Sequence, residues 1–533
     1  MRLATILAFV TGLFAASPSA SADPTADVVI SPDGDRVEVA YAFSEPVTRV
    51  LLPFARPNGP DADVRVVGAL LTGAELTSPE PFTHVTLSIG PDRRERDSVY
   101  PLVSVLDGQG FVVYAPHLVP ADMPVAVRIL DQVQPLSPTA VEGYVLLGGQ
   151  VEDYGTMRMT VSSATPPAFG MEAAQRARAI VDYYTARMER SPNRVPTVLL
   201  SYRPVTAATD AGGFRGDVSA NGVVFLRVRV GAQATESLSM DRYTSFLAHE
   251  IFHLWNASRN PDRLDWWVHE GAAEYASWTA VKALWPATTP SLEERLTTAF
   301  RNCALYLGDR PLNTLSDQES RPVRYSCGAI LQWSAALGAE TENTDIFALW
   351  RDLSAKRDVE GRYTAADFLA AVDRRAPSAT GAVHSIVETP GIDRWSALAD
   401  TANGLGVEAV VGPPAAFPLR INASRALVLS ACGEIQGVGD GPEGLYVQAP
   451  EGCDGFGPQT FIVSVNGVAP GADPARYFTV IAETCAAQGS VEIVARNDGE
   501  ETTRSLRCTV PVDPAPAEIT IRRALASAEV RRD

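Results

Sequence analysis

The chain has 533 residues, of which 46% are hydrophobic and 20% are charged, and its formal net charge at pH 7 is -18. This apolar content can fill a sizeable core, which excludes a disordered polymer. The acidic balance argues against a nucleic-acid partner, because such proteins need a basic face to displace phosphate counterions. The length predicts about two to four domains.

Residues 1–22 have the layout of a secretory signal peptide. Arg2 gives a positive start, an apolar run follows, and Ala20, Ser21 and Ala22 are small residues typical of a cleavage site. The apolar run is shorter than the roughly 20 residues that a membrane anchor needs. No later segment is long and apolar enough to cross a bilayer. We therefore expect an exported protein, periplasmic or secreted.

Residues 23–168 are expected to form an N-terminal β-sandwich domain. Short alternating runs, such as residues 37–41, 99–103 and 157–161, are separated by Pro, Gly and Asp. An alternation with a period of two is typical of strands that bury one face. The chain is therefore predicted to be a multidomain α+β protein that begins with an antiparallel sandwich.

Residues 169–404 are predicted to form a mainly helical domain. Apolar residues recur about every 3.6 positions in four segments, residues 171–190, 241–256, 268–285 and 326–339. All eight tryptophans lie between Trp255 and Trp395. This concentration of large aromatic side chains supports a separate core for the region.

Residues 405–533 are expected to form a second β domain. Gly and Pro become frequent again, and short β-like runs appear, including residues 426–429 and 491–494. The region also carries four of the six cysteines.

The cysteines are expected to form disulfides in an oxidising compartment. Six cysteines allow about fifteen pairings, and proximity in sequence favours three of them: Cys303–Cys327, Cys432–Cys453 and Cys485–Cys508. A cysteine metal site is the weaker interpretation, because the chain has no C-x-x-C spacing.

The most informative segment contains His249, Glu250 and His253 in a helical context. Histidines four residues apart lie on one face of a helix, one turn from each other. This spacing allows two imidazole nitrogens to bind one tetrahedral ion at about 2.0–2.1 Å, and Glu250 can reach a bound water. H-E-x-x-H is the signature of zinc peptidases. The alternative is a pair of core histidines on an apolar helix.

A catalytic zinc site also needs a third protein ligand and an open position. Glu270 opens the next helical run and can return to the metal. Glu274 lies one turn further on the same face, where it can accept a hydrogen bond from a liganding imidazole. Either residue could instead be an acid favoured near a helix N-terminus. His269 is a competing ligand, but the helix turns it about 100° away from Glu270.

Residues 249–256, followed by residues 267–275, resemble the gluzincin zinc peptidases, and most closely the glycyl aminopeptidase family, of which the chain would be a divergent member. The resemblance implies a thermolysin-like catalytic domain that acts on peptides or proteins. It also implies one Zn²⁺ per chain, with His249, His253 and Glu270 as ligands and Glu250 as the general base.

The resemblance extends to residues 324–331, where gluzincins carry Tyr-x-x-Gly. By that match Tyr325 is a catalytic residue whose hydroxyl supports the tetrahedral intermediate. From the residues alone, a tyrosine that opens an apolar helix is more often a packing residue.

Gly212, Gly213, Phe214 and Arg215 occupy the place of the family's substrate-binding segment, which reads Gly-Gly-Leu-Glu-His. The family's glutamate is associated with gripping a free amino terminus, and Arg215 reverses its charge. Arg215 would repel an ammonium group and could pair with a carboxylate. Asp217 is an alternative anchor for the amine.

The C-terminal residues 461–468 and 490–499 resemble part of a PDZ domain, and an immunoglobulin-like domain is the alternative. For the whole chain, two functions compete with peptide hydrolysis. One is peptide binding on a degenerate peptidase scaffold, and the other is zinc hydrolysis of a non-peptide substrate. The sequence leaves open the oligomeric state and the choice between exopeptidase and endopeptidase action.

Overall fold

The chain divides into two units, residues 1–150 and residues 151–533. The predicted signal peptide and Gly212 lie outside the residues that the structure describes. The computed structural model describes residues 24–53, 63–91, 100–108, 110–130, 142–205, 213–231, 240–256, 265–288, 290–316, 323–391, 393–433, 437–441, 444–449, 453, 456–457, 460–497, 499–512 and 517–523.

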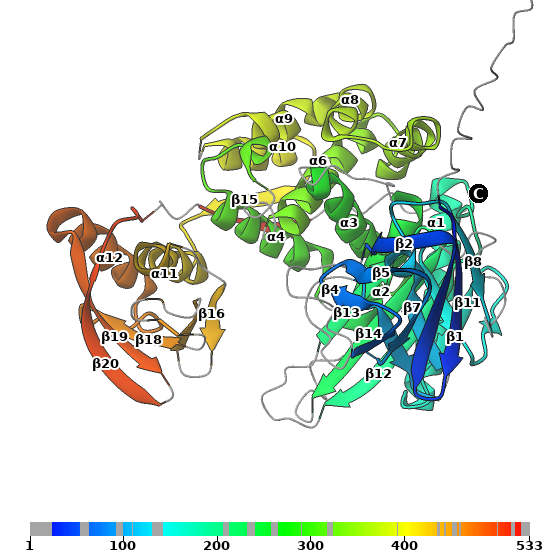
Figure 1. The fold of residues 1–533 in the computed structure, drawn as a ribbon. Coiled ribbons are helices and arrows are strands. Elements are labelled where there is room, and N and C mark those ends of the chain that lie inside the picture. Colours follow the sequence, from blue (N-terminus) through cyan, green and yellow to red (C-terminus); the bar gives the residue numbers. More distant parts are fainter. Residues whose placement is uncertain are drawn as a thin grey trace, which may run out of the picture. The chain divides into compact units, whose positions relative to one another are not determined.

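The first unit is built from two sheets, as expected for a β-sheet N-terminal region (Figure 1). In the larger sheet, neighbours are antiparallel except for the parallel pair β1 and β8. Alternate residues of both sheets turn inward and form one hydrophobic core. The larger sheet contains β1 (Ala26–Asp33), β2 (Arg36–Leu51), β3 (Val64–Val67), β4 (Leu70–Thr72), β5 (Glu75–Ile89) and β8 (Val125–Ile129), and the smaller contains β6 (Val103–Leu106), β7 (Gly110–Tyr114) and β9 (Tyr144–Leu147).

The second unit opens with a five-stranded sheet in the order β10-β11-β12-β14-β13. Strands β11, β12 and β14 are parallel, and β13 lies antiparallel at one edge. The sequence patterns do not predict this sheet inside the helical domain, and the alternating run at residues 157–161, which forms β11, was expected in the N-terminal sandwich. The predicted boundary at residue 168 therefore lies inside the second unit. The strands are β10 (Glu152–Asp153), β11 (Arg158–Val161), β12 (Thr197–Val205), β13 (Gly213–Val218) and β14 (Val223–Gly231).

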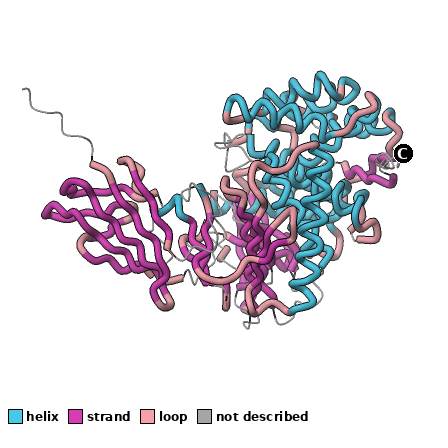
Figure 2. Tube along the Cα trace, turned by 90° about the vertical axis from the view of Figure 1, so that its right-hand side faces the viewer, coloured by secondary structure: helices cyan, strands magenta, loops and turns pink. Residues whose placement is uncertain are grey.

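Helices make up most of the rest of this unit (Figure 2). The four predicted helical segments correspond to α1, α2, α3 and α6. Capping boxes begin α4 at Ser291 and α8 at Thr364. No described helix is long and apolar enough to span a membrane. The helices are α1 (Pro167–Met188), α2 (Met240–Asn256), α3 (Trp266–Leu284), α4 (Leu292–Leu307), α6 (Arg324–Thr341), α7 (Ile346–Glu360), α8 (Ala365–Arg375), α9 (Thr380–Glu388) and α10 (Arg394–Gly404).

Helices α3 and α6 touch backbone to backbone at two glycines. A Cβ on Gly271 would lie 2.2 Å from the Gly328 Cα, and a Cβ on Gly328 would lie 2.1 Å from the Trp267 carbonyl oxygen. Side chains of any size would therefore push the two helices apart. The disulfide Cys303–Cys327 fastens α6 to α4 beside this contact.

In the C-terminal segment, a region of helices and strands is inserted between two strands that pair with each other. β15 (Glu408–Gly412) and β21 (Glu518–Arg523) pair antiparallel and bury Ala409, Ile519 and Ile521 in the core of the helical region. The inserted part has its own core. It contains α11 (Ala416–Cys432), β16 (Gly437–Gly441), β17 (Gly444–Gln448), β18 (Thr460–Val465), α12 (Pro474–Gln488), β19 (Ser490–Asn497) and β20 (Glu500–Arg507), with the five strands antiparallel in chain order.

Two predictions for this segment have different outcomes. Residues 426–429 belong to α11, so the prediction of a strand there was wrong. A short apolar run fits a buried helix as well as a strand, and only its packing partners decide between them. All three predicted cysteine pairs are disulfides.

Replacing Gly271 by alanine should lower the free energy of unfolding by about 1–3 kcal/mol, because overpacking forces α3 and α6 apart. Gly381→Ala in α9 is the matched control, since a Cβ there meets no atom within 4 Å. The control should be neutral or stabilising by about 0.5–1 kcal/mol. Urea unfolding of both variants checks this, and equal effects would contradict the close contact.

Candidate active site

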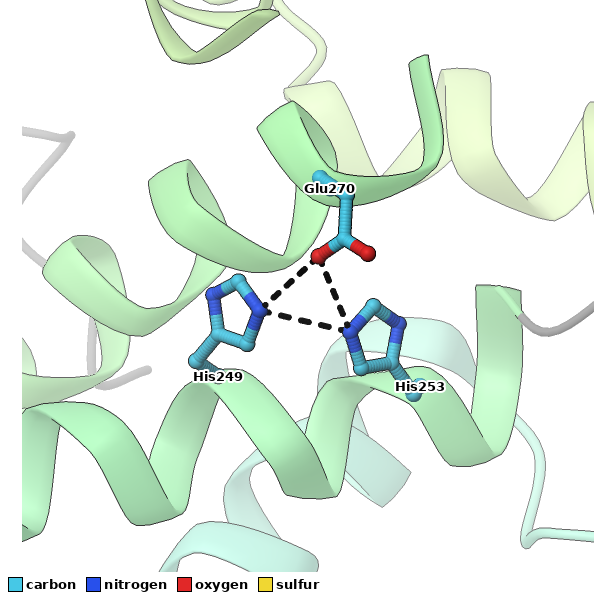
Figure 3. A group of neighbouring side chains, drawn as sticks. All are labelled: His249, His253 and Glu270. Carbon is cyan, nitrogen blue, oxygen red and sulfur yellow. Dashed lines mark hydrogen bonds and ion pairs between the residues drawn. The ribbon is translucent and has the colours of Figure 1, made fainter. Parts of the chain in front are cut away.

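The three predicted zinc ligands lie together between α2 and α3 (Figure 3). The Nε2 atom of His249 lies 3.3 Å from the Oε2 atom of Glu270 and 3.3 Å from the Nε2 atom of His253. The nearest ligand atoms of the three side chains all lie within 4.8 Å of one another, and all three side chains are buried. Among the residues that the structure describes, these three side chains form the group that could hold a metal ion.

The second nitrogen of each imidazole already has an acceptor. The Nδ1 atom of His249 lies 3.0 Å from the carboxylate of Glu274, and the Nδ1 atom of His253 lies 2.9 Å from the Oδ1 atom of Asn256. When Nδ1 carries the proton in each neutral ring, Nε2 is left with a lone pair. Two such lone pairs then face each other and a carboxylate oxygen. Three electron-pair donors therefore converge with no proton between them, and such an arrangement suits a bound cation.

Asn256 was not singled out from the sequence. Its Nδ2 atom donates to the His269 carbonyl oxygen at 2.8 Å, so its Oδ1 atom is the one that faces His253. The sequence feature that could have identified Asn256 is its position three residues after His253, on the same helical face. Asn256 thereby sets the tautomer of His253.

His269 lies beside the three predicted ligands and does not belong to the group that could hold a metal ion. Its ring stacks on His253 with 4.3 Å between ring centroids, and its Nδ1 atom lies 3.2 Å from the Tyr363 hydroxyl. Burial lowers the pKa of His269 to about 3. A neutral ring packed in this way supports His253 by stacking.

Glu250 lies on α2 between the two histidines and is buried. Burial raises the pKa of its carboxyl group to about 7. Gly216 of β13 makes room for this side chain, since a Cβ there would lie 2.5 Å from the Glu250 Cδ atom. The edge strand β13 therefore forms one wall around Glu250.

Tyr325 stands at the start of α6, with its ring centroid 5.7 Å from that of His249. The ring lies under the guanidinium group of Arg324, and 39% of the residue is exposed. A core packing residue would be covered, so this exposure beside a histidine favours a role at the surface of the site. The close contact of α6 with α3 holds the tyrosine there.

The predicted substrate-binding residues Gly213, Phe214 and Arg215 lie on β13, and Gly212 lies outside the described residues. The Phe214 ring packs against Phe246 of α2 at 5.5 Å between centroids. Because side chains alternate along a strand, Arg215 lies on the opposite face from Phe214.

The alternative amine anchor, Asp217, lies on the same face of β13 as Arg215. Its carboxylate accepts a hydrogen bond of 2.7 Å from the buried guanidinium group of Arg227. Asp217 therefore already neutralises a cation of this chain.

Comparisons with known proteins show a shared fold. An aminopeptidase N family protein from Idiomarina loihiensis matches with a TM-score of 0.58 and 12% sequence identity, over 94% of this chain and 98% of that protein. An M1 zinc metallopeptidase from Deinococcus radiodurans covers 68% of this chain and 93% of its own at 16% identity, with a TM-score of 0.37 that carries no weight. No protein-family model and no curated protein matches the sequence.

Replacing Asn256 by alanine should weaken zinc binding by about 10–100-fold, because His253 loses the acceptor that fixes its tautomer. The control is Asn302→Ala on α4, which lies outside these contacts. Competition titration with a chelating dye measures both affinities. Unchanged zinc binding in the Asn256 variant would show that this residue does not orient His253.

Proposed function

We propose that this chain is an exported zinc-dependent metallopeptidase, aminopeptidase-like, in which Glu250 assists the attack of water on a peptide bond. The observation that carries the proposal is the convergence of two imidazole lone pairs and a carboxylate oxygen, with a buried glutamate beside them. The shared fold with an aminopeptidase N family protein supports the same assignment. Fold alone does not define an activity, which resides in the geometry of the site.

The side chains of His249, His253 and Glu270 suit one Zn²⁺ ion per chain. Two neutral imidazoles and one carboxylate are the ligands of the hydrolytic His₂Glu zinc sites, which keep one position open. A zinc ion held by His249, His253 and Glu270 would supply Lewis acidity, polarising a carbonyl oxygen and acidifying a water molecule. Glu274 and Asn256 hold the two rings in the orientation that this requires.

Glu250 acts as the general base and then as the general acid. Its desolvated carboxyl group has a pKa of about 7, which suits proton transfer near neutral pH. It takes a proton from the attacking water and passes that proton to the leaving amine. The Tyr325 hydroxyl donates a hydrogen bond to the oxyanion of the tetrahedral intermediate.

A peptide can reach these groups along β13. This strand lies at the edge of its sheet, and an extended peptide can add to such an edge by main-chain hydrogen bonds. Gly216 brings that edge next to Glu250. The substrate is therefore a peptide or protein segment in extended conformation.

We assign the chain to a divergent branch of the glycyl aminopeptidase family, with Gly213, Phe214 and Arg215 in its substrate-binding segment and a PDZ-like C-terminal insertion. The signal-like residues 1–22 and the three disulfides support export to an oxidising compartment. Charge reversal at Arg215 favours cleavage that does not require a free amino terminus.

Replacing Glu250 by glutamine should leave zinc binding intact and lower kcat by about 10²–10⁴-fold, because glutamine cannot accept the proton. Zinc content by elemental analysis and single-peptide kinetics check the two parts separately. A zinc-loaded variant with undiminished turnover would sink the assignment of Glu250. Zinc-loaded wild-type protein that cleaves no member of a peptide library would favour the competing function, non-catalytic peptide binding.

Replacing Tyr325 by phenylalanine should lower kcat by about 10²-fold with little change in KM, since the lost hydrogen bond forms in the transition state. Thermal unfolding should not change, because the ring and its contacts with His249 and Arg324 remain. A rise in KM with unchanged kcat would instead make Tyr325 a residue of substrate binding.

Peptides with acetylated amino termini should be cleaved at least as fast as peptides with free amino termini, because acetylation removes the ammonium group that Arg215 would repel. Mass-spectrometric mapping of the products identifies the cleaved bonds. Cleavage confined to the first bond of free peptides would show that the chain is a strict aminopeptidase despite Arg215.

A further inference from the structure

The side chain of Arg324, the first residue of α6, lies over two aromatic rings. Its Cζ atom is 4.7 Å from the centroid of the Trp266 ring and 5.3 Å from that of the Tyr325 ring. Trp266 is the first residue of α3, so the guanidinium group connects the starts of the two helices. We call Trp266, Arg324 and Tyr325 the cation–π cluster.

Within the residues that the structure describes, the guanidinium group of Arg324 contacts these two rings and no carboxylate. The residue is half-buried, and its Nε atom is buried without a hydrogen-bond partner. The Nε1 atom of Trp266 is buried without a partner as well. Guanidinium groups are weakly hydrated and stack on aromatic faces. Stacking on the rings, and not an ion pair, therefore sets the position of Arg324.

The proposed role of Tyr325 requires its hydroxyl to stay in one place. This hydroxyl makes no hydrogen bond with the described residues, and the residue is partly exposed. The contact between α3 and α6 fixes the backbone at this point, but a side chain can still turn among its staggered rotamers. Arg324 covers the Tyr325 ring and connects it to Trp266 on the other helix. This contact restricts the rotamer of Tyr325.

Arg324 also brings positive charge to a place where carboxylates predominate. The charged groups that act most strongly on Tyr325 are the carboxylates of Glu250, Glu270 and Glu274 and the guanidinium group of Arg324. Carboxylates near a phenol oppose hydrogen bonding to a further negative charge. The cation of Arg324 acts against them, and so favours a hydrogen bond from Tyr325 to an oxyanion.

We propose that Arg324 is a positioning residue for peptide hydrolysis, which holds the Tyr325 hydroxyl at the oxyanion by stacking on the rings of Tyr325 and Trp266. This inference rests on the proposed peptidase function and adds to it the residue on which the tyrosine depends. Arg324 touches no reacting atom and acts through Tyr325. A donor that is already in place stabilises the transition state without reorganisation, and a small misplacement of such a group costs rate.

Replacing Arg324 by glutamine should lower kcat about tenfold with little change in KM, because the tyrosine hydrogen bond forms in the transition state. Arg324→Lys should recover part of this loss, since an ammonium group also binds aromatic faces. The matched control is Arg301→Gln on α4, because Arg301 lies over the Phe417 ring at 5.7 Å and its Nε atom is likewise without a partner. The control should keep the wild-type kcat. A rise in KM with unchanged kcat in Arg324→Gln would overturn the positioning role.

A double-mutant cycle tests whether Arg324 acts through the tyrosine. In the Tyr325→Phe protein no hydroxyl remains to be positioned, so adding Arg324→Gln should change kcat by less than about twofold. A tenfold loss in that background would show that Arg324 acts on the substrate directly, and would overturn the proposal. Trp266→Leu removes the other ring and is a second variant if Arg324→Gln does not fold by circular dichroism. Its smaller loss of kcat should also disappear in the Tyr325→Phe background.

Binding of a phosphinic peptide gives a readout that does not depend on cleavage, because its tetrahedral, anionic group resembles the intermediate. Calorimetric titration of the zinc-loaded full-length protein should show about tenfold weaker binding in Arg324→Gln, and no further weakening when Tyr325→Phe is already present. This result supports the positioning role even if the wild-type protein cleaves no peptide, which would overturn the proposed function alone. Unchanged binding in Arg324→Gln, or no binding to the wild-type protein, would overturn the positioning role, and peptide cleavage by the wild-type protein would leave the peptidase assignment standing.

Discussion

The backbone contact between Gly271 and Gly328 is the constraint on which the candidate site depends. Glu270 directly precedes the first glycine, and Tyr325 stands three residues before the second. Because neither glycine has a side chain, α3 and α6 approach until their backbones meet. That approach places Glu270 and Tyr325 around the histidines of α2. The disulfide Cys303–Cys327 links α6 to α4 next to this contact.

The chemistry of the site follows from where protons are held. Glu274 and Asn256 each accept a hydrogen bond from a histidine Nδ1 atom, and this leaves two Nε2 lone pairs directed at the Glu270 carboxylate. A third interaction, between Asn256 and the His269 carbonyl oxygen, keeps the amide oxygen facing His253. The site is therefore organised by the hydrogen bonds around it as much as by the two histidines and the glutamate that converge in it.

Sequence patterns predicted the helices of the site well and the surrounding sheet poorly. The spacing of His249 and His253 places both on one helical face, and α2 has that geometry. The first four residues of β12 and of β14, residues 197–200 and 223–226, are buried in parallel strands, so these apolar runs carry no alternation that would distinguish them from helix. Residues 426–429 were assigned to a strand for the same reason, since a short apolar run suits either structure. The face on which Arg215 lies depends on strand register, which no local pattern reveals.

The sequence by itself determined the residue types of the candidate metal site, the helical spacing of its two histidines and the pairing of the cysteines close in sequence. These properties are local, because they depend on residues within one helix or on short loops. Tertiary structure decided the rest: the meeting of Glu270 with the histidines and the roles of Asn256 and Gly216. Each of these depends on segments that are distant in sequence. Their proximity is set by packing and strand pairing over the whole unit, and no window of sequence contains that information.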